Sequence, residues 1–168
     1  MEDRSVTRTT SGRPASSART PRAASAAAST ATTPSVRSRM QLQRTRDTRP
    51  ELAVRRLLHS AGLRYRVDRA PLPGLRRRAD VVFGPAKVAL YVDGCFWHGC
   101  PQHPRTARAN SAYWQSKLAA NRARDANTDR QLAAAGWLVL RVWEHEDPAA
   151  VAARVVVAVS ERIGRRPA

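Results

Sequence analysis

The sequence predicts an α/β domain in which a mixed four-stranded sheet is flanked by helices. Three short apolar runs, at 63–67, 80–83 and 88–92, follow a helical segment and are separated by turns that contain Pro and Gly. A fourth apolar run, 137–143, comes after a long helical segment at 111–135. Short connections favour an antiparallel meander, whereas a helical crossover returns the fourth strand parallel to its neighbour. The expected order is therefore α-β-β-β-α-β-α.

The predicted helices have recognisable ends. Thr48 is a suitable N-cap for the first helix, over 50–61, and Gly62 ends that helix. Gly136 ends the long helix in the same way, because glycine readily adopts the left-handed conformation of a helix terminus. An Asp-Pro pair begins a last helix over 148–163, which is rich in Val and Ala. Helices therefore precede and follow the predicted strands.

The N-terminal segment differs in composition from the rest of the chain. Residues 1–38 are mainly Ser, Thr, Ala, Arg and Pro and contain no aromatic side chain. Such a segment cannot bury enough apolar surface to offset the entropy of ordering, so we predict a disordered basic tail. Residues 39–47 are expected to form a short helix or arm. The remainder, 39–164, is expected to fold as a single domain.

The charge of the chain predicts a polyanionic partner. Its 168 residues include 30 Lys and Arg against 13 Asp and Glu, a formal net charge of +17. Basic side chains release counterions from a phosphate backbone, so nucleic acid is the favoured partner. A soluble domain with a basic tail is the alternative. No apolar run approaches the roughly 20 residues that span a bilayer, and the N-terminus lacks the apolar segment of a secretory signal. We therefore expect no membrane association.

Acidic residues are scarce before the last strand, which makes Asp80 and Asp93 conspicuous. Asp80 begins one predicted strand and Asp93 follows the next. An antiparallel hairpin therefore brings Asp80 beside the carboxyl end of the 88–92 strand. A carboxylate next to strand-end backbone carbonyl groups suits Mg²⁺, which activates water for attack on phosphorus. The alternative is that both residues only shape turns.

Both cysteines of the chain lie in a pattern typical of zinc sites. Cys95 and Cys100 are five apart and are followed by His103. Two cysteines cannot form a disulfide framework and fit a reducing compartment. His145, just after the last strand, is the predicted fourth ligand, and four protein ligands would make the zinc structural. The alternative is two buried free cysteines.

The same turn holds a histidine and two aromatic residues. His98 lies between the cysteines and could ligate zinc, but a ring directed toward Asp80 would serve as general base on the attacking water. Phe96 and Trp97 are adjacent, so at least one ring is hard to bury. With Trp114 of the long helix they could form a wedge between base steps of DNA. For Trp114 the alternative is an ordinary core position.

These motifs together resemble the very short patch repair endonucleases, bacterial mismatch-nicking enzymes with the PD-(D/E)xK, or restriction-endonuclease-like, nuclease fold. The resemblance extends over about 37–147, and Gly-Cys-Phe-Trp-His is its most specific part. The segments that carry it are 46–52, 72–74 leading to Asp80, 93–100, 113–114, 121–125 and 136–144. The resemblance implies an endonuclease domain that nicks DNA 5′ to the T of a T:G mismatch, left by deamination of 5-methylcytosine. This Mg²⁺-dependent hydrolysis would initiate very short patch repair.

The resemblance also implies roles for individual residues. Asp80 and the backbone of Val92 would bind the catalytic Mg²⁺. His98 would be the general base, Asp125 would orient it, and Glu51 would lie at the rear of the site. The intercalating residues would be Phe96, Trp97 and Trp114, and the structural Zn²⁺ ligands would be Cys95, Cys100, His103 and His145. The expected setting is a monomer in the bacterial cytoplasm, at the nucleoid, acting on double-stranded DNA, with mismatch-repair proteins as candidate partners.

The chain departs from the family pattern in several places. Ala79 stands where the family usually has Pro, and 76–78 resembles a small insertion. Asp93 stands where some members have His, and could instead add a metal ligand. His145 stands where a third Cys is usual. These departures leave two alternatives open: a related PD-(D/E)xK nuclease with a different target, and a catalytically inactive DNA-binding protein stapled by zinc.

Overall fold

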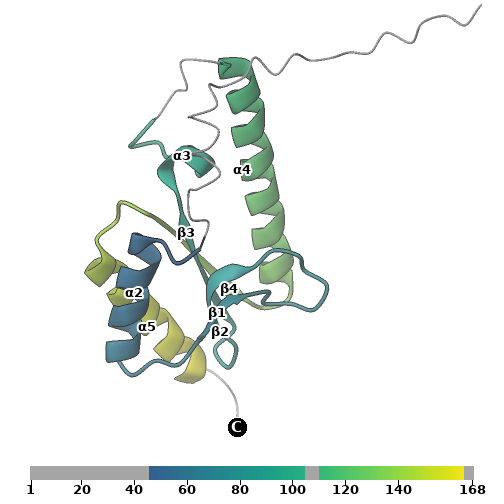
Figure 1. The fold of residues 1–168 in the computed structure, drawn as a ribbon. Helices are drawn as coiled ribbons and strands as arrows, with labels where there is room; N and C mark the ends of the chain where they lie inside the picture. The colour runs from purple at the N-terminus through teal and green to yellow at the C-terminus, as the bar shows by residue number, and fades with distance from the viewer. Residues whose placement is uncertain (1–45, 105–109, 165–168) are drawn as a thin grey trace, which may run out of the picture. The chain divides into compact units, whose positions relative to one another are not determined.

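The computed structural model describes residues 46–104 and 110–164. The tail predicted at 1–38, and residues 39–45 of the predicted arm, lie outside the described residues. The elements are α2 (Arg49–Ser60), β1 (Arg66–Arg69), β2 (Ala79–Phe83), β3 (Val88–Asp93), α3 (Cys95–His98), α4 (Ser111–Ala134), β4 (Leu138–Trp143) and α5 (Pro148–Gly164) (Figure 1). None of the helices in the described ranges is both long and apolar enough to cross a membrane.

The four strands form one mixed sheet in the order β1-β2-β3-β4 (Figure 1). β2 pairs antiparallel with both β1 and β3, whereas β3 and β4 run parallel, with Val88 opposite Leu138. A parallel neighbour requires a crossover connection, and α4 provides it. The predicted mixed four-stranded sheet flanked by helices is therefore confirmed.

Apolar side chains cover both faces of the sheet. On one face α2 and α5 pack against the strands in a cluster whose buried members are Val54, Leu58, Val81, Phe83, Ala86, Val88, Leu90, Val142, Val151, Ala152, Val155 and Val159. On the other face Leu132 of α4 and Leu72 of the β1–β2 loop pack near Tyr91. Because strand side chains alternate between faces, Tyr91 and its neighbours on that side point toward α4.

The first strand lies later than the sequence predicts. We expected it at 63–67, but pairing with β2 begins at Arg66, opposite Val82. The prediction is wrong because Leu63 and Tyr65 alternate with arginines for another reason: they pack against the α2–α5 face from the linker that precedes the strand. An apolar-polar alternation marks burial on one side, and only the pairing partner defines a strand.

The turn predicted at 93–103 contains a short helix, α3, that the sequence does not reveal. Four residues are too few for a helical period to be recognisable. Gly99 ends α3 in the left-handed conformation, at φ 66°, which favours glycine. The chain then turns back so that the Cys100 N–H donates to the Cys95 carbonyl at 2.9 Å. α3 thus sets the spacing of the two cysteines.

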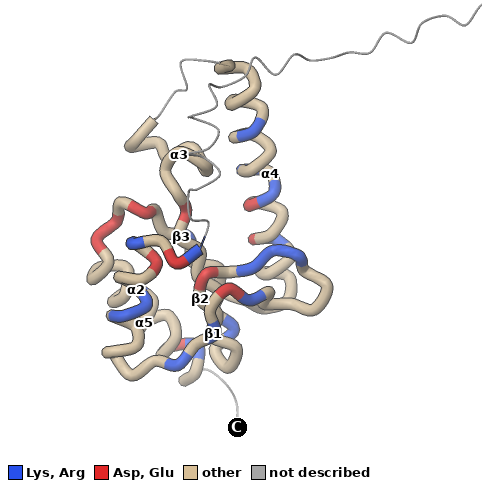
Figure 2. Tube along the Cα trace, viewed as in Figure 1, with Lys and Arg blue, Asp and Glu red and all other residues tan. Residues whose placement is uncertain are grey.

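α4 is largely exposed, which explains its frequent polar residues. Its 24 residues extend about 36 Å, and its buried residues are Thr128 and Leu132, both near its C-terminal end. The N-terminal part lies beside α3 instead of the sheet (Figure 1). Figure 2 shows acidic segments at the ends of β2 and β3 and along α4. Acidic residues therefore occur on α4 as well as at the ends of the central strands.

Candidate functional site

Asp80 lies at the start of β2, against the carboxyl end of β3. Its Oδ2 accepts a hydrogen bond from the Val92 N–H at 2.7 Å. The pKa of Asp80 is raised to about 6, first by burial, while the bond from Val92 lowers it. The charges of Glu51, Asp93 and Asp68 raise this pKa further. A cation would relieve the repulsion, and carboxylate oxygens beside strand-end carbonyl groups are ligands that suit Mg²⁺.

Glu51 is buried at the N-terminal end of α2, with 6% of its surface exposed. Its Oε2 accepts the Asp47 N–H at 2.9 Å, and its Oε1 accepts the Thr48 hydroxyl at 2.8 Å. Glu51, three residues after the N-cap, therefore accepts hydrogen bonds from groups at the start of its own helix. Its negative charge nevertheless acts on Asp80, so the two carboxylates are close enough to repel each other.

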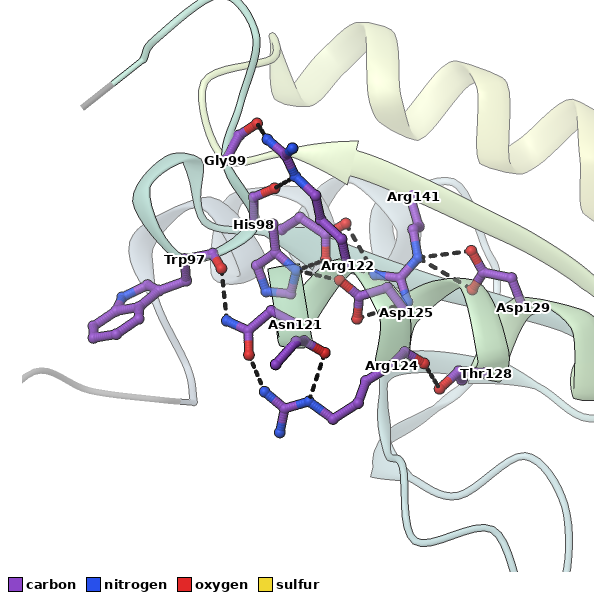
Figure 3. Close-up of polar contacts among 12 residues, drawn as sticks. Trp97, His98, Gly99, Asn121, Arg122, Arg124, Asp125, Thr128, Asp129 and Arg141 are labelled. Carbon is purple, nitrogen blue, oxygen red and sulfur yellow. Dashed lines mark hydrogen bonds and ion pairs between the residues drawn. The ribbon is translucent and has the colours of Figure 1, made fainter. Parts of the chain in front are cut away.

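His98, the last residue of α3, is hydrogen-bonded to α4 (Figure 3). Its Nδ1 lies 2.7 Å from Asp125 Oδ2 and 3.6 Å from Asp93 Oδ1. An ionised carboxylate can only accept, so Nδ1–H donates and Nε2 is left as the acceptor. The structure thus brings His98 and Asp125 together in the geometry of an oriented general base.

Arg141 of β4 contacts three carboxylates beside this histidine (Figure 3). Its Nη1 lies 2.8 and 3.0 Å from the two oxygens of Asp93, and its Nη2 lies 3.3 Å from Asp125 Oδ1. Its Nε lies 3.1 Å from both oxygens of Asp129. Sequence reasoning did not assign a role to Arg141 or Asp129. The sequence does contain one indication of a role for Arg141, because it is the single charged residue in the apolar run 137–143.

The two cysteines and two histidines predicted as metal ligands come together. Their ligand atoms all lie within 4.8 Å of one another. Cys95 Sγ is 3.1 Å from His145 Nδ1 and 3.9 Å from His103 Nδ1, and Cys100 Sγ is 3.8 Å from each. Around one tetrahedral zinc ion such sulfur and nitrogen atoms stand roughly 3.6 Å apart. The four side chains can therefore hold one metal ion.

Outer contacts orient this Cys₂His₂ cluster. His145 Nε2 lies 2.9 Å from Gln102 Oε1, so Nε2–H donates and Nδ1 is free to ligate. Glu144 Oε1 accepts the Cys95 N–H at 2.7 Å, which links the end of β4 to α3. Burial, and next the Cys100 thiol, raise the pKa of the Cys95 thiol to about 11. A metal cation would overcome this shift by binding the thiolate.

An aromatic cluster lies on α3 and the start of α4. The Phe96 ring centroid is 5.1 Å from those of Trp97 and Trp114, and Trp97 and Trp114 are 5.8 Å apart. Tyr113, 56% exposed, packs edge-on against Trp114 at 5.4 Å. Asn121 Nδ2 donates to the Trp97 carbonyl at 2.7 Å, which ties α3 to α4. The three predicted intercalating residues therefore form one cluster, and Tyr113 is a fourth member that we did not predict.

A large hollow in the described part of the chain lies elsewhere. About 1060 Å³ in volume, it is lined by β1, by the loop 69–78 and by Trp137, and includes none of the predicted site residues. A smaller hollow of about 330 Å³ lies against Trp97, Tyr113 and Trp114. The predicted site residues therefore lie outside the first of these hollows, and two of them, Trp97 and Trp114, line the second.

Comparison with known proteins finds DNA endonucleases. The family model of the DNA mismatch endonuclease Vsr matches residues 29–103. The Type II nicking enzyme V.NaeI of Lentzea aerocolonigenes is 45% identical over 119 residues, which cover 70% of this chain and 72% of that protein. The Type II nicking enzyme V.XorIIP of Xanthomonas oryzae pv. oryzae is 47% identical over 109 residues, 64% of this chain and 77% of that protein. The DNA mismatch endonuclease Vsr of Escherichia coli K12 is 36% identical over 101 residues, 60% of this chain and 63% of that protein.

Proposed function

The chain belongs to the Vsr family of DNA endonucleases, and we propose that it nicks one strand of duplex DNA 5′ to the T of a T:G mismatch, which initiates very short patch repair. The observation that carries this proposal is that the short helix α3 holds both His98, which is bonded to Asp125, and two rings of the half-buried aromatic cluster, Phe96 and Trp97. A nuclease that reads a distorted base step needs both a group that enters the stack and a cutting site nearby.

In the proposed reaction His98 removes a proton from the attacking water. The proton goes to Nε2, because Nδ1 is engaged with Asp125 Oδ2 at 2.7 Å. Asp80 and the backbone carbonyl of Val92 would hold Mg²⁺. Glu51 would lie behind them and hold the N-terminal end of α2 through its bonds to Asp47 and Thr48. When bound, Mg²⁺ supplies charge stabilisation at the phosphate oxygens.

The aromatic cluster is the proposed mismatch reader. A T:G pair stacks less well than a matched pair, so a wedge of Phe96, Trp97 and Trp114 separates its base steps at lower cost. The net charge of +17 adds attraction to phosphates that does not depend on sequence. Recognition would thus come from the wedge, and general affinity from the arginines.

The metal held by Cys95, Cys100, His103 and His145 is proposed to be Zn²⁺. Two thiolates with two imidazoles are a ligand set that zinc favours, and the site has no open position for a substrate. The ion would fix the loop between β3 and α4 to the end of β4. Its proposed role is structural: it holds α3, and with it His98 and the aromatic rings.

The names of two relatives favour a second candidate. V.NaeI and V.XorIIP are described as Type II nicking enzymes, so a nicking enzyme with another preferred target is the alternative. The deciding experiment uses duplexes that differ at one position, with T:G, T:A, C:G or another mismatch, in Mg²⁺ or EDTA. We expect nicking only in the T:G duplex, in the strand that carries the T, and only when Mg²⁺ is present. Equal cutting of matched duplexes would reject the T:G proposal, and binding without cutting would favour a DNA-binding protein.

Removal of the wedge is expected to weaken mismatch recognition. Base–aromatic stacking contributes about 1–3 kcal/mol per ring, so Trp97→Ala should lower affinity for the T:G duplex by roughly 5–150-fold. Affinity for matched DNA should change much less, because phosphate contacts dominate there. Fluorescence anisotropy with both duplexes measures the two affinities. Val157→Ala, an exposed side chain on α5, is the control. An equal loss on both duplexes would contradict a reading role.

A further inference from the structure

Arg141 occupies a position where a charge has no obvious structural purpose. β4 is otherwise apolar, and the Arg141 side chain is 20% exposed. Its guanidinium carbon lies 4.6 Å from the centre of the Tyr91 ring, its partner in the parallel register of β3 and β4. A buried ion network is seldom more stable than well-packed apolar residues of similar volume. The network therefore calls for an explanation other than stability.

The contacts of Arg141 converge on His98 by two routes. Asp125 accepts the His98 Nδ1–H through Oδ2 and contacts Arg141 through its other oxygen, Oδ1 (Figure 3). Asp93 binds Arg141 through both oxygens, at 2.8 and 3.0 Å, and lies 3.6 Å from His98 Nδ1. Both carboxylates that face the histidine are thus held by one guanidinium group.

Asp129 completes the arrangement from the next turn of α4. Its two oxygens lie 3.1 Å from Arg141 Nε, so the guanidinium has all its edges engaged and little freedom to rotate. Burial alone would lower the pKa of Arg141, but the bonds to Asp129 and Asp93 raise it. Arg141 is therefore a permanent, fixed cation among three carboxylates.

We propose that Arg141 is a positioning residue for the nicking reaction. It fixes Asp125 so that His98 keeps its proton on Nδ1 and presents Nε2 as the base. It also occupies both oxygens of Asp93, which keeps that carboxylate from becoming a ligand of the catalytic cation. This inference rests on the proposed function, in which His98 accepts the proton from water. The sequence left Asp93 as a candidate metal ligand, and the ion pair favours the other role.

Two variants test the proposal, and each limits the number of carboxylates that lose their positively charged partner. Arg141→Lys keeps the charge but cannot bond to three carboxylates at once. The triple variant Asp93→Asn, Asp129→Asn, Arg141→Met removes the cation together with two of its partners, so it should fold. Arg154→Met removes a surface arginine that pairs with Glu146 and is the matched control. Steady-state nicking of a T:G duplex gives kcat and KM for each.

We expect both variants to lose about 100-fold in kcat, as for a small misplacement of a catalytic group, with KM changed by less than about threefold. The control should match the unaltered protein. If Arg141 serves stability alone, the triple variant will keep the kcat and the melting temperature of the unaltered protein, and the proposal fails. An unchanged kcat for Arg141→Lys would also overturn it.

A second measurement needs neither DNA nor activity. In ¹⁵N-histidine-labelled protein, the His98 signals, assigned by their loss in His98→Gln, should report protonated Nδ1 and bare Nε2. Both Arg141 variants should show a mixture of tautomers. Identical His98 signals in the unaltered protein and in both Arg141 variants would overturn the positioning role. If T:G duplexes are not nicked at all, the spectra still test the Arg141 contacts, so failure of the proposed function is distinguished from failure of this inference.

Discussion

Asp80→Asn is expected to abolish Mg²⁺-dependent nicking and, at neutral pH, to stabilise the protein. Asparagine keeps an oxygen that accepts the Val92 N–H but loses the charge that binds the cation. The ionised Asp80 side chain is disfavoured in the folded state, since burial and the neighbouring carboxylates raise its pKa from 3.8 to about 6. A shift of this size corresponds to at most about 3 kcal/mol. Partial exposure reduces the expected gain to about 1–2 kcal/mol in the free energy of unfolding.

The gain from Asp80→Asn should depend on pH with a defined sign. An acid whose pKa is raised on folding carries no penalty below pH 3.8, where it is protonated in both states. The penalty grows between pH 3.8 and about 6 and stays constant above that range. Urea unfolding without Mg²⁺ should therefore show little difference near pH 4 and the full difference at pH 7.

Mg²⁺ should reverse this order of stability. It stabilises a protein that binds it in the folded state, so the unaltered protein should gain stability in Mg²⁺ and Asp80→Asn should not. Asp147→Asn is the matched control, because Asp147 is exposed and its amide would still accept the Ala150 N–H. Persistent Mg²⁺-dependent nicking by Asp80→Asn, or an equal gain of stability from Mg²⁺ in both proteins, would show that Asp80 does not hold the cation.

Loss of the Cys₂His₂ metal is expected to cost at least about 3 kcal/mol of stability, because ligand binding at a structural zinc site is also folding energy. Cys100 is 2% exposed and lies at the point where α3 turns toward the rest of the loop. Cys100→Ser should leave no bound zinc, lower the melting temperature and reduce nicking, since α3 carries both His98 and the aromatic rings. Elemental analysis gives the metal content, and we expect one zinc per chain.

Two comparisons separate this metal from the catalytic one. Asp80→Asn should retain its zinc, and His59→Ala, an exposed histidine of α2 outside the cluster, should retain both zinc and stability. Protein loaded with Co²⁺ should show the visible absorption of tetrahedral coordination. Full stability and activity in zinc-free Cys100→Ser would mean that the cluster does not support α3. Loss of zinc in Asp80→Asn would mean that the two sites are not independent.

Local sequence patterns were sufficient to predict the bounds of most helices and strands. They were also sufficient to identify residues whose chemical type is itself informative, such as metal ligands. α2, β2, β3, α4, β4 and α5 begin and end within about two residues of their predicted positions. Cysteines and histidines at a ligand spacing, and an acid at the start of a buried strand, are recognisable because few structural positions require them. By contrast, the start of β1 and the helix α3 were missed. The start of β1 is defined by its pairing with β2, which no local pattern shows. The four residues of α3 are too few to reveal a helical periodicity.

The sequence by itself determined a mixed sheet, a Cys₂His₂ ligand set and the pairing of Asp80 with the end of β3, since hairpin geometry alone brings those two together. Only the tertiary structure decided the partners of Arg141. Its contact with Asp93 joins residues 48 positions apart and depends on the parallel register of β3 with β4 and on the placement of α4 over that face. No local pattern encodes such a register, because it follows from how helix, strand and crossover pack together.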